Sequence, residues 1–178
     1  SIHAPVGSGA KLLRQRAGKI MTNQFCKDFQ ACLEQLVAPL RFHHRPSGEL
    51  VGVSVHEAML PAKPVGYQEG DELPLLRWCI YEGEFSGRVA NGFSVALDAG
   101  IYSPGSIIDG SRDLMLLINT LGGLARMHGL PPYKLRTPIS FRLGDPRDGN
   151  EGIQPHPYYY GRLTMDFIYA GPGSACKP

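Results

Sequence analysis

The sequence predicts a single α+β domain, in which a mostly antiparallel or mixed sheet of about four to five strands is backed by two main helices. Two stretches repeat apolar residues every three or four positions, as the buried side of a helix does. Several others alternate apolar and polar residues, as a half-buried strand does. The connections are short, which favours antiparallel neighbours. A length of 178 residues fits one domain better than two.

The first helix is predicted over residues 20–37. Its apolar stripe consists of Met21, Phe25, Phe29, Leu36 and either Cys32 or Leu33. Pro39 closes the segment because proline cannot continue a helix.

The second helix is predicted to begin near residue 109, where Asp109 or Ser111 provides the N-cap and Asp113 places a negative charge in the first turn. Gly129 and the two prolines after it end the segment. The expected buried stripe comprises Leu114, Leu117 or Ile118, Leu121, and Leu124 or Ala125.

Five stretches have the pattern of strands: residues 51–55, 75–81, 93–101, 134–143 and 162–169. The second is apolar on both faces, which predicts a central strand covered on both sides. It is expected to pair antiparallel with the third. Pro138 interrupts the fourth, which predicts an edge strand or a bulge.

The last two of these strands also carry polar faces. Leu135, Ile139, Phe141 and Leu143 are predicted to face the core, and Lys134, Arg136 and Arg142 the opposite side. Near the last strand, alternation places Tyr158, Tyr160 and Arg162 opposite the core stripe. Exposed tyrosines beside arginine are enriched in protein interfaces, so these three are candidate interface residues.

The chain is divided into a flexible basic arm (residues 1–19), a folded domain (20–171) and a short tail (172–178). The arm has no acidic residue and carries Lys11, Arg14, Arg16 and Lys19. It is a candidate partner-binding segment that orders only against a partner, and a solvated tail without a role is the equal alternative.

Composition excludes several classes. With 43% hydrophobic and 19% charged residues, intrinsic disorder is not expected, and a net charge of +2 does not suggest a polycation built for nucleic acid. No apolar run is long enough to span a bilayer, and residues 1–18 lack the apolar core of a signal peptide. A soluble, cytoplasmic protein is therefore expected.

No catalytic, metal or cofactor motif emerges. The pattern around Ser94 continues as a strand, whereas a nucleophile elbow needs a strand-to-helix turn. His43 and His44 are adjacent, so their side chains diverge. The four cysteines form no C-x-x-C pair, and free thiols are expected. We therefore predict no enzyme, no cofactor and no metal.

Six short motifs occur in an order that resembles a known family. They are VHEAMLP (55–61), LPLLRWCIYEG (73–83), VALDAGIY (95–102), GSRD (110–113), LRTPI (135–139) and PHPYYYG (155–161). Together they resemble the tail terminator, or tail completion, proteins of tailed bacteriophages and prophages. The similarity covers about residues 20–170, so the basic arm lies outside it.

The resemblance implies a structural virion protein of the tail and neck, assembled in the host cytoplasm. Such a protein forms a sixfold ring that caps the tail tube and joins it to the head. Its implied partners are its own copies, the tail tube protein and a head-completion or neck protein, with sheath or collar as further candidates. Genomic DNA would pass through the lumen without sequence-specific binding, and no membrane is involved.

A closed ring needs two different, complementary patches on each subunit. The acidic loop with Glu69, Asp71 and Glu72 and the basic strand face with Lys134, Arg136 and Arg142 are the candidates. In a competing hypothesis the basic face lines the lumen near DNA.

Other functions stay open. The chain is alternatively a neck connector or baseplate subunit, or a small enzyme with a site assembled from scattered residues such as His128, Asp113 and Cys79. A nucleic-acid-binding module is the third alternative.

Overall fold

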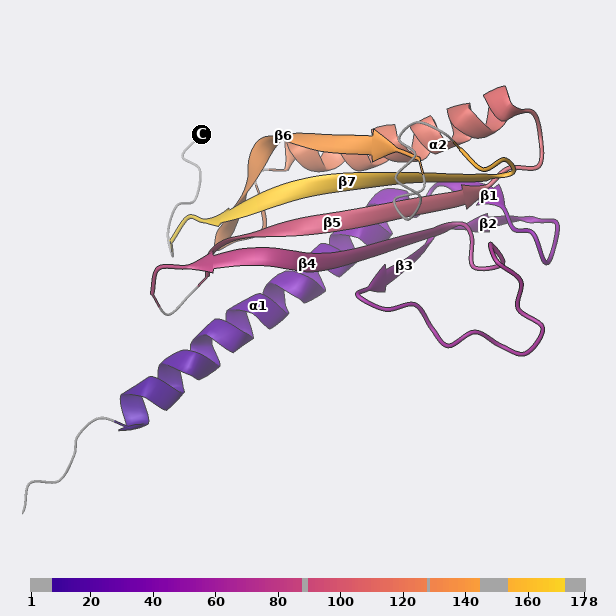
Figure 1. Ribbon diagram of the computed structural model, residues 1–178. Helices are drawn as coiled ribbons and strands as arrows, with labels where there is room; N and C mark the ends of the chain where they lie inside the picture. The colour runs from indigo at the N-terminus through magenta and orange to yellow at the C-terminus, as the bar shows by residue number, and fades with distance from the viewer. Residues whose placement is uncertain (1–7, 88–89, 128, 145–153, 172–178) are drawn as a thin grey trace, which may run out of the picture.

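Four long strands make up most of the sheet, in the order β6–β7–β5–β4, and every neighbouring pair is antiparallel (Figure 1). Their bounds are Leu75–Phe85 (β4), Ala90–Tyr102 (β5), Tyr133–Leu143 (β6) and Tyr158–Tyr169 (β7). This computed structural model describes residues 8–87, 90–127, 129–144 and 154–171, with side chains from residue 23 onward.

Three short strands extend the sheet, one beside β4 and two beyond the end of β5. β3 (Ser54–Glu57) runs parallel to the start of β4, whereas β2 (Leu50–Gly52) pairs with β1 (Arg41–His43), which meets the end of β5. Only Val53 separates β2 from β3, although they lie at opposite ends of the strand order. The mixed, mostly antiparallel sheet is therefore nearly barrel-shaped. The predicted fold class is confirmed, but the single strand expected over residues 51–55 is divided into two.

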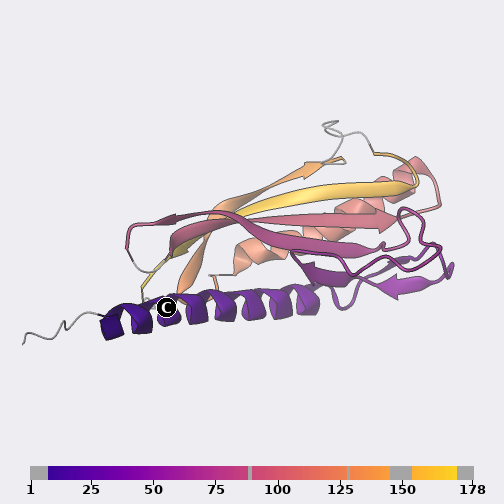
Figure 2. The ribbon, with the colours of Figure 1, turned by 60° about the horizontal axis from the view of Figure 1, so that its bottom comes forward.

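α1 (Ser8–Val37) begins twelve residues before the position expected from the apolar pattern. Residues 8–19 of the predicted flexible arm are therefore helical, while residues 1–7 and 172–178 lie outside the described part of the chain. The correction has a simple reason, because residues 10–17 are mostly good helix formers and no proline interrupts them. The first turns of α1 extend beyond the sheet (Figures 1 and 2).

α2 (Ile107–Leu121) is the second helix. Its N-cap is Ser106, not Asp109 or Ser111. Asp109 instead closes a capping box, because its carboxylate accepts hydrogen bonds from the backbone N–H and the hydroxyl of Ser106. The helix also ends earlier than expected, since Gly122 begins a 3-10 helix (η1, Gly122–Arg126). Because α2 begins at Ile107, Asp113 lies in its second turn, where it accepts a hydrogen bond from Ser103.

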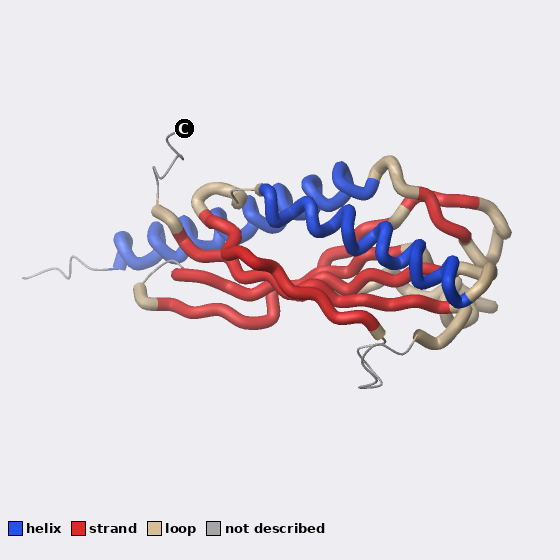
Figure 3. The backbone as a smooth tube through the Cα atoms, turned by 90° about the horizontal axis from the view of Figure 1, so that it is seen from above, coloured by secondary structure: helices blue, strands red, loops and turns tan. Residues whose placement is uncertain are grey.

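Both helices pack against one face of the sheet (Figures 2 and 3). α1 contributes Phe25, Phe29, Leu33 and Val37, and α2 contributes Leu114, Leu117, Ile118 and Leu121. The rings of Phe25, Phe29, Trp78, Phe93, Tyr133 and Phe167 form an aromatic cluster with centroid distances of 4.6–5.8 Å. Trp78 also donates to the Gln30 side-chain oxygen at 2.8 Å, which ties α1 to β4.

β6 is an edge strand, as Pro138 predicts: among the described strands it pairs only with β7, and its register shifts between Arg136 and Ser140. Leu135, Ile139 and Leu143 pack against the core as expected. Phe141 lies on the same face but is 50% exposed, because it stands at the rim of a hollow between β6 and the end of α2.

Candidate interaction surface

The sheet has a second face, turned away from α1 and α2, which we call the open face. Four rows of residues, in register across β4, β5, β7 and β6, point to this face, and most of their side chains are polar or charged. The rows are Arg77–Asp98–Arg162–Arg142, Cys79–Ala96–Thr164–Ser140, Glu82–Ser94–Asp166–Arg136 and Glu84–Gly92–Ile168–Lys134. No described helix covers this face (Figure 2).

An Arg–Asp–Arg cluster lies at the centre of the open face. Asp98 accepts a hydrogen bond from Arg77 at 2.8 Å and two from Arg162 at 2.6 and 3.1 Å. The Asp98 hydrogen bonds raise the pKa of the Arg162 guanidinium, which therefore stays charged. Two cations share one carboxylate, so the cluster has a net charge of +1. Sequence alternation predicted that Arg162 lies on this side, but it could not find the pairing of Arg162 and Arg77 with Asp98.

Two further rows carry opposite charges at their two ends. Glu82 lies at the β4 end and Arg136 at the β6 end of one row, and Glu84 and Lys134 hold the same places in the next. Asp166, in between, accepts a hydrogen bond from Ser94 at 2.6 Å. Lys134, Arg136 and Arg142 thus lie together on the predicted face. Glu82 and Glu84 were not singled out by the sequence.

The tyrosines at the end of β7 are less available than predicted. Tyr158 and Tyr160 lie opposite the buried Tyr159, as expected, but both are half-buried. Gly70 (φ +90°) lies so close to the Tyr158 ring that a Cβ atom there would come within 2.3 Å of it. Leu73 is buried and packs over Gly100 beside Tyr160. The loop before β4 (residues 58–74) therefore covers this end of the open face and buries Leu75. The expectation that residues 75–81 are covered on both sides is otherwise wrong, because Arg77 is 43% exposed on the open face.

The predicted acidic patch belongs to that same loop, and its carboxylates have internal roles. Asp71 forms an ion pair with Arg45 at 3.5 Å and accepts a hydrogen bond from the backbone of Gln68. Glu72 accepts hydrogen bonds from the Tyr67 hydroxyl and from the backbone of Gly70. Burial, followed by the Glu72 hydrogen bond, raises the pKa of Tyr67.

Glu69 is the third predicted acidic residue. Its backbone oxygen accepts a hydrogen bond from Arg45, at 3.3 Å. These interactions fold the loop onto the domain. Whether the acidic loop also contacts another subunit stays a prediction.

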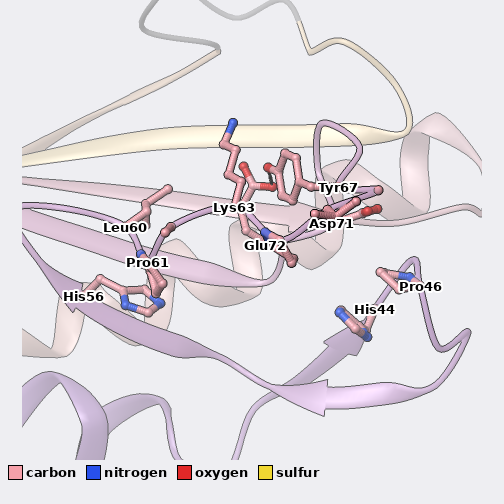
Figure 4. Close-up of a pocket in the computed structure, with 13 residues that line it drawn as sticks. His44, Pro46, His56, Leu60, Pro61, Lys63, Tyr67, Asp71 and Glu72 are labelled. Carbon is pink, nitrogen blue, oxygen red and sulfur yellow. Dashed lines mark hydrogen bonds between the residues drawn. The ribbon is translucent and has the colours of Figure 1, made fainter.

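A pocket of about 480 Å³ lies beneath the outer part of this loop (Figure 4). Its walls include His44, His56, Tyr67 and the loop prolines. The Lys63 ammonium stands 4.4 Å from the centre of the Tyr67 ring, a cation–π contact. The lining mixes apolar residues with charges of both signs and so does not define a ligand class.

The scattered residues of the alternative enzyme site are not brought together. Cys79 lies on the open face, whereas Asp113 lies in α2, which covers the other face. His128 lies outside the described residues. Cys26, Cys32 and Cys79 are free thiols, as predicted, and Cys176 also lies outside the described part.

The remaining chemical predictions concern ions and membranes. Within the described ranges, no three His, Cys, Asp or Glu side chains are placed to hold a metal ion. None of the described helices combines the length and the apolar composition that crossing a bilayer requires. Lys11, Arg14, Arg16 and Lys19 belong to α1, but their side chains are outside the described set, and their partner-binding role stays a prediction.

Comparison of the chain with models of known protein families finds no match, and comparison with curated proteins finds no similar protein.

Proposed function

We propose that this chain is a structural subunit of a tailed-phage virion: a tail terminator that forms a ring on the end of the tail tube and joins it to the head. The proposal rests on the ordered motifs between residues 55 and 161, which resemble that family. Its partners would be its own copies, the tail tube protein and a neck protein, and its place would be the virion.

The open face is the structural observation that carries the proposal furthest. A sheet packed by helices on one side only, with charged rows on the other, offers a broad polar surface to neighbouring molecules. Ring subunits need such surfaces because each one contacts two neighbours as well as the tube. The Arg77–Asp98–Arg162 cluster suits this role, since arginines with further free N–H donors can bind carboxylates of a partner.

The deciding experiment deletes the gene from the phage or prophage that encodes it and images the induced lysate by negative-stain electron microscopy. A terminator predicts overlong or ragged tails beside DNA-filled, tailless heads. Expression of the wild-type chain from a plasmid should restore normal virions, which controls for effects on neighbouring genes.

Two other outcomes would contradict the terminator role. Tails of normal length that fail to join heads would make the chain a neck connector. Normal, infectious virions would exclude an essential role in tail assembly and return attention to the enzyme and nucleic-acid-binding alternatives.

A further inference from the structure

Opposite edges of the open face carry opposite charges near the turn that joins β4 to β5. Glu82 and Glu84 are exposed on β4. The exposed Arg136 and the half-buried Lys134 lie on β6, three strands away in the same two rows. None of the four side chains forms a hydrogen bond or ion pair with another described residue. Within one chain the two ends of a row are separated by three strand spacings, roughly 14 Å. Among the described residues no ion pair joins the two ends of either row, although Glu82, Glu84 and Arg136 line one shared hollow on this face.

Both edges also lack a neighbouring strand among the described residues. β3 covers β4 only from Leu75 to Trp78, so residues 79–85 have no partner on their outer side. β6 pairs only with β7. An unpaired strand edge has free backbone N–H and C=O groups, which can pair with a strand of another chain. Charged side chains on the edge determine which strands can approach it.

Exposed apolar side chains accompany the charges. Tyr81 is 54% and Phe85 74% exposed on β4, and Ile168 is 40% exposed on β7 beside Lys134. Aromatic side chains ringed by charge are typical of the centre of protein interfaces. The edges thus combine apolar contact area with charge complementarity.

From these observations we infer that the β4 edge of one copy docks against the β6 edge of a second copy, with Glu82 beside Arg136 and Glu84 beside Lys134. The strand directions support this arrangement. β4 and β6 run in opposite directions within the sheet, so a copy added at the β4 edge presents an antiparallel β6. The two surfaces differ, so the contact is heterologous and passes from copy to copy in one direction.

The inference deepens the proposed ring and replaces the acidic loop by Glu82 and Glu84 as the partner of the basic strand. It does not require the tail itself, because it concerns only contact between copies of this chain. It can therefore be tested on the purified protein.

The test uses a zero-length carbodiimide crosslink between carboxylate and amine. Chains labelled with ¹⁴N and ¹⁵N are mixed at high concentration, crosslinked and digested, and the linked peptides are identified by mass spectrometry. The inference predicts a link between Glu82 or Glu84 and Lys134 that joins a light peptide to a heavy one. No such link in the wild-type chain would overturn it.

Charge reversal then tests specificity. One variant carries Glu82→Lys and Glu84→Lys, and a second carries Lys134→Glu and Arg136→Glu. Neither variant alone can form this link, because two amines or two carboxylates then face each other, so each serves as a negative control. An equal mixture of both, and a charge-swapped chain with all four substitutions, should regain it.

Control measurements separate docking from folding. Circular dichroism verifies that each variant is folded, and Glu49→Lys, which reverses an exposed charge away from both edges, should keep the link. A folded charge-swapped chain that fails to crosslink would contradict the inference, as would an equal mixture of the two folded variants that forms no link between them.

Failure here is distinguishable from failure of the proposed function. If the edges dock and deletion of the gene leaves tails normal, the contact stands and the tail role falls. If deletion gives overlong tails and no edge link forms, the tail role stands and the ring uses other surfaces.

Discussion

The two faces of the same four strands differ in what holds them together. The helix-covered face is apolar and aromatic, with Phe29 and Trp78 in T-shaped contact at 4.9 Å. The open face carries ion pairs and hydrogen bonds, such as Asp98 with its two arginines, which remain more than 40% exposed. Burial of apolar area supplies most of the stability, whereas exposed ion pairs supply little. The covered face should therefore determine folding, and the open face should be free to serve contacts with other molecules.

The sharpest test of this difference is Phe29→Ala. Phe29 is buried between Phe25, Trp78 and Phe167, so its loss leaves a cavity in the aromatic cluster. The free energy of unfolding should fall by about 3–5 kcal/mol. Denaturant titration followed by fluorescence of the single tryptophan measures it. As a control, Tyr81→Ala removes an exposed ring from β4 and should change stability by less than about 0.5 kcal/mol. Equal losses of unfolding free energy in the two variants would contradict the view that the helix-covered face supplies most of the stability.

The packing of α2 on the sheet is tested by Gly110→Ala. A Cβ atom at position 110 would lie 2.1 Å from the Tyr159 ring, which is itself buried, so the helix must shift. The expected loss is about 1–3 kcal/mol. Gly122→Ala is the matched control, since nothing lies within 4 Å of its Cβ position and its φ of −57° suits alanine. That variant should gain about 0.4–1 kcal/mol. A loss at Gly122 equal to that at Gly110 would show that the Tyr159 contact is not the cause.

On the open face, Asp98→Asn should cost about 1–2 kcal/mol, because Arg77 and Arg162 lose the carboxylate that they share. The loss should shrink at high salt, since salt screens the repulsion left between the two guanidinium groups. Thermal unfolding at low and high salt measures both effects. Asp166→Asn, whose carboxylate binds only Ser94 among the described residues, should cost less than about 1 kcal/mol. A salt-independent loss at Asp98 would instead indicate a packing role.

The smallest effect is expected at the start of α2. Ser106→Ala removes the N-cap and should cost about 1 kcal/mol at neutral pH. The Ser106 hydrogen bonds hold the pKa of Asp109 below its ordinary value of 3.8, so the folded state favours the ionised carboxylate. This stabilisation is present above pH 3.8 and is lost as the pH falls through the folded-state pKa. The difference between the two proteins in denaturant titrations should therefore narrow in acid, and the part that remains belongs to the Asp109 backbone N–H bonded to the Ser106 hydroxyl. A difference that stays constant with pH would exclude the ionised Asp109 as its source.

The sequence predicted most of the covered face, because its periodicity records burial directly. The stripes in both helices and the alternation in β5 and β7 identify residues that lie in the core. Capping residues were less reliable as predictors of where a helix begins. Ser106 was missed as the N-cap because Asp109 also has a capping side chain, and only the backbone path shows that Asp109 stands at the third position of the helix.

Glu82 and Glu84 show why the candidate surface could not be predicted in full. Strict alternation from Trp78 through Ile80 would place both carboxylates on the helix-covered face. The register shift between Ile80 and Glu82 inserts Tyr81 and turns them to the open face. A single extra residue thus reverses the side on which every later residue lies, and no local pattern announces it.

By itself, the sequence determined the fold class, the core residues and the polar side of the sheet, because these follow from which side chains avoid water. Only the tertiary structure decided that β2 and β3 lie at opposite ends of the strand order and that Asp98 binds two arginines. It also decided that the two charged rows have their acidic ends on β4 and their basic ends on β6. Those features depend on strand order and register, which join residues far apart in the chain and leave no periodic trace in it.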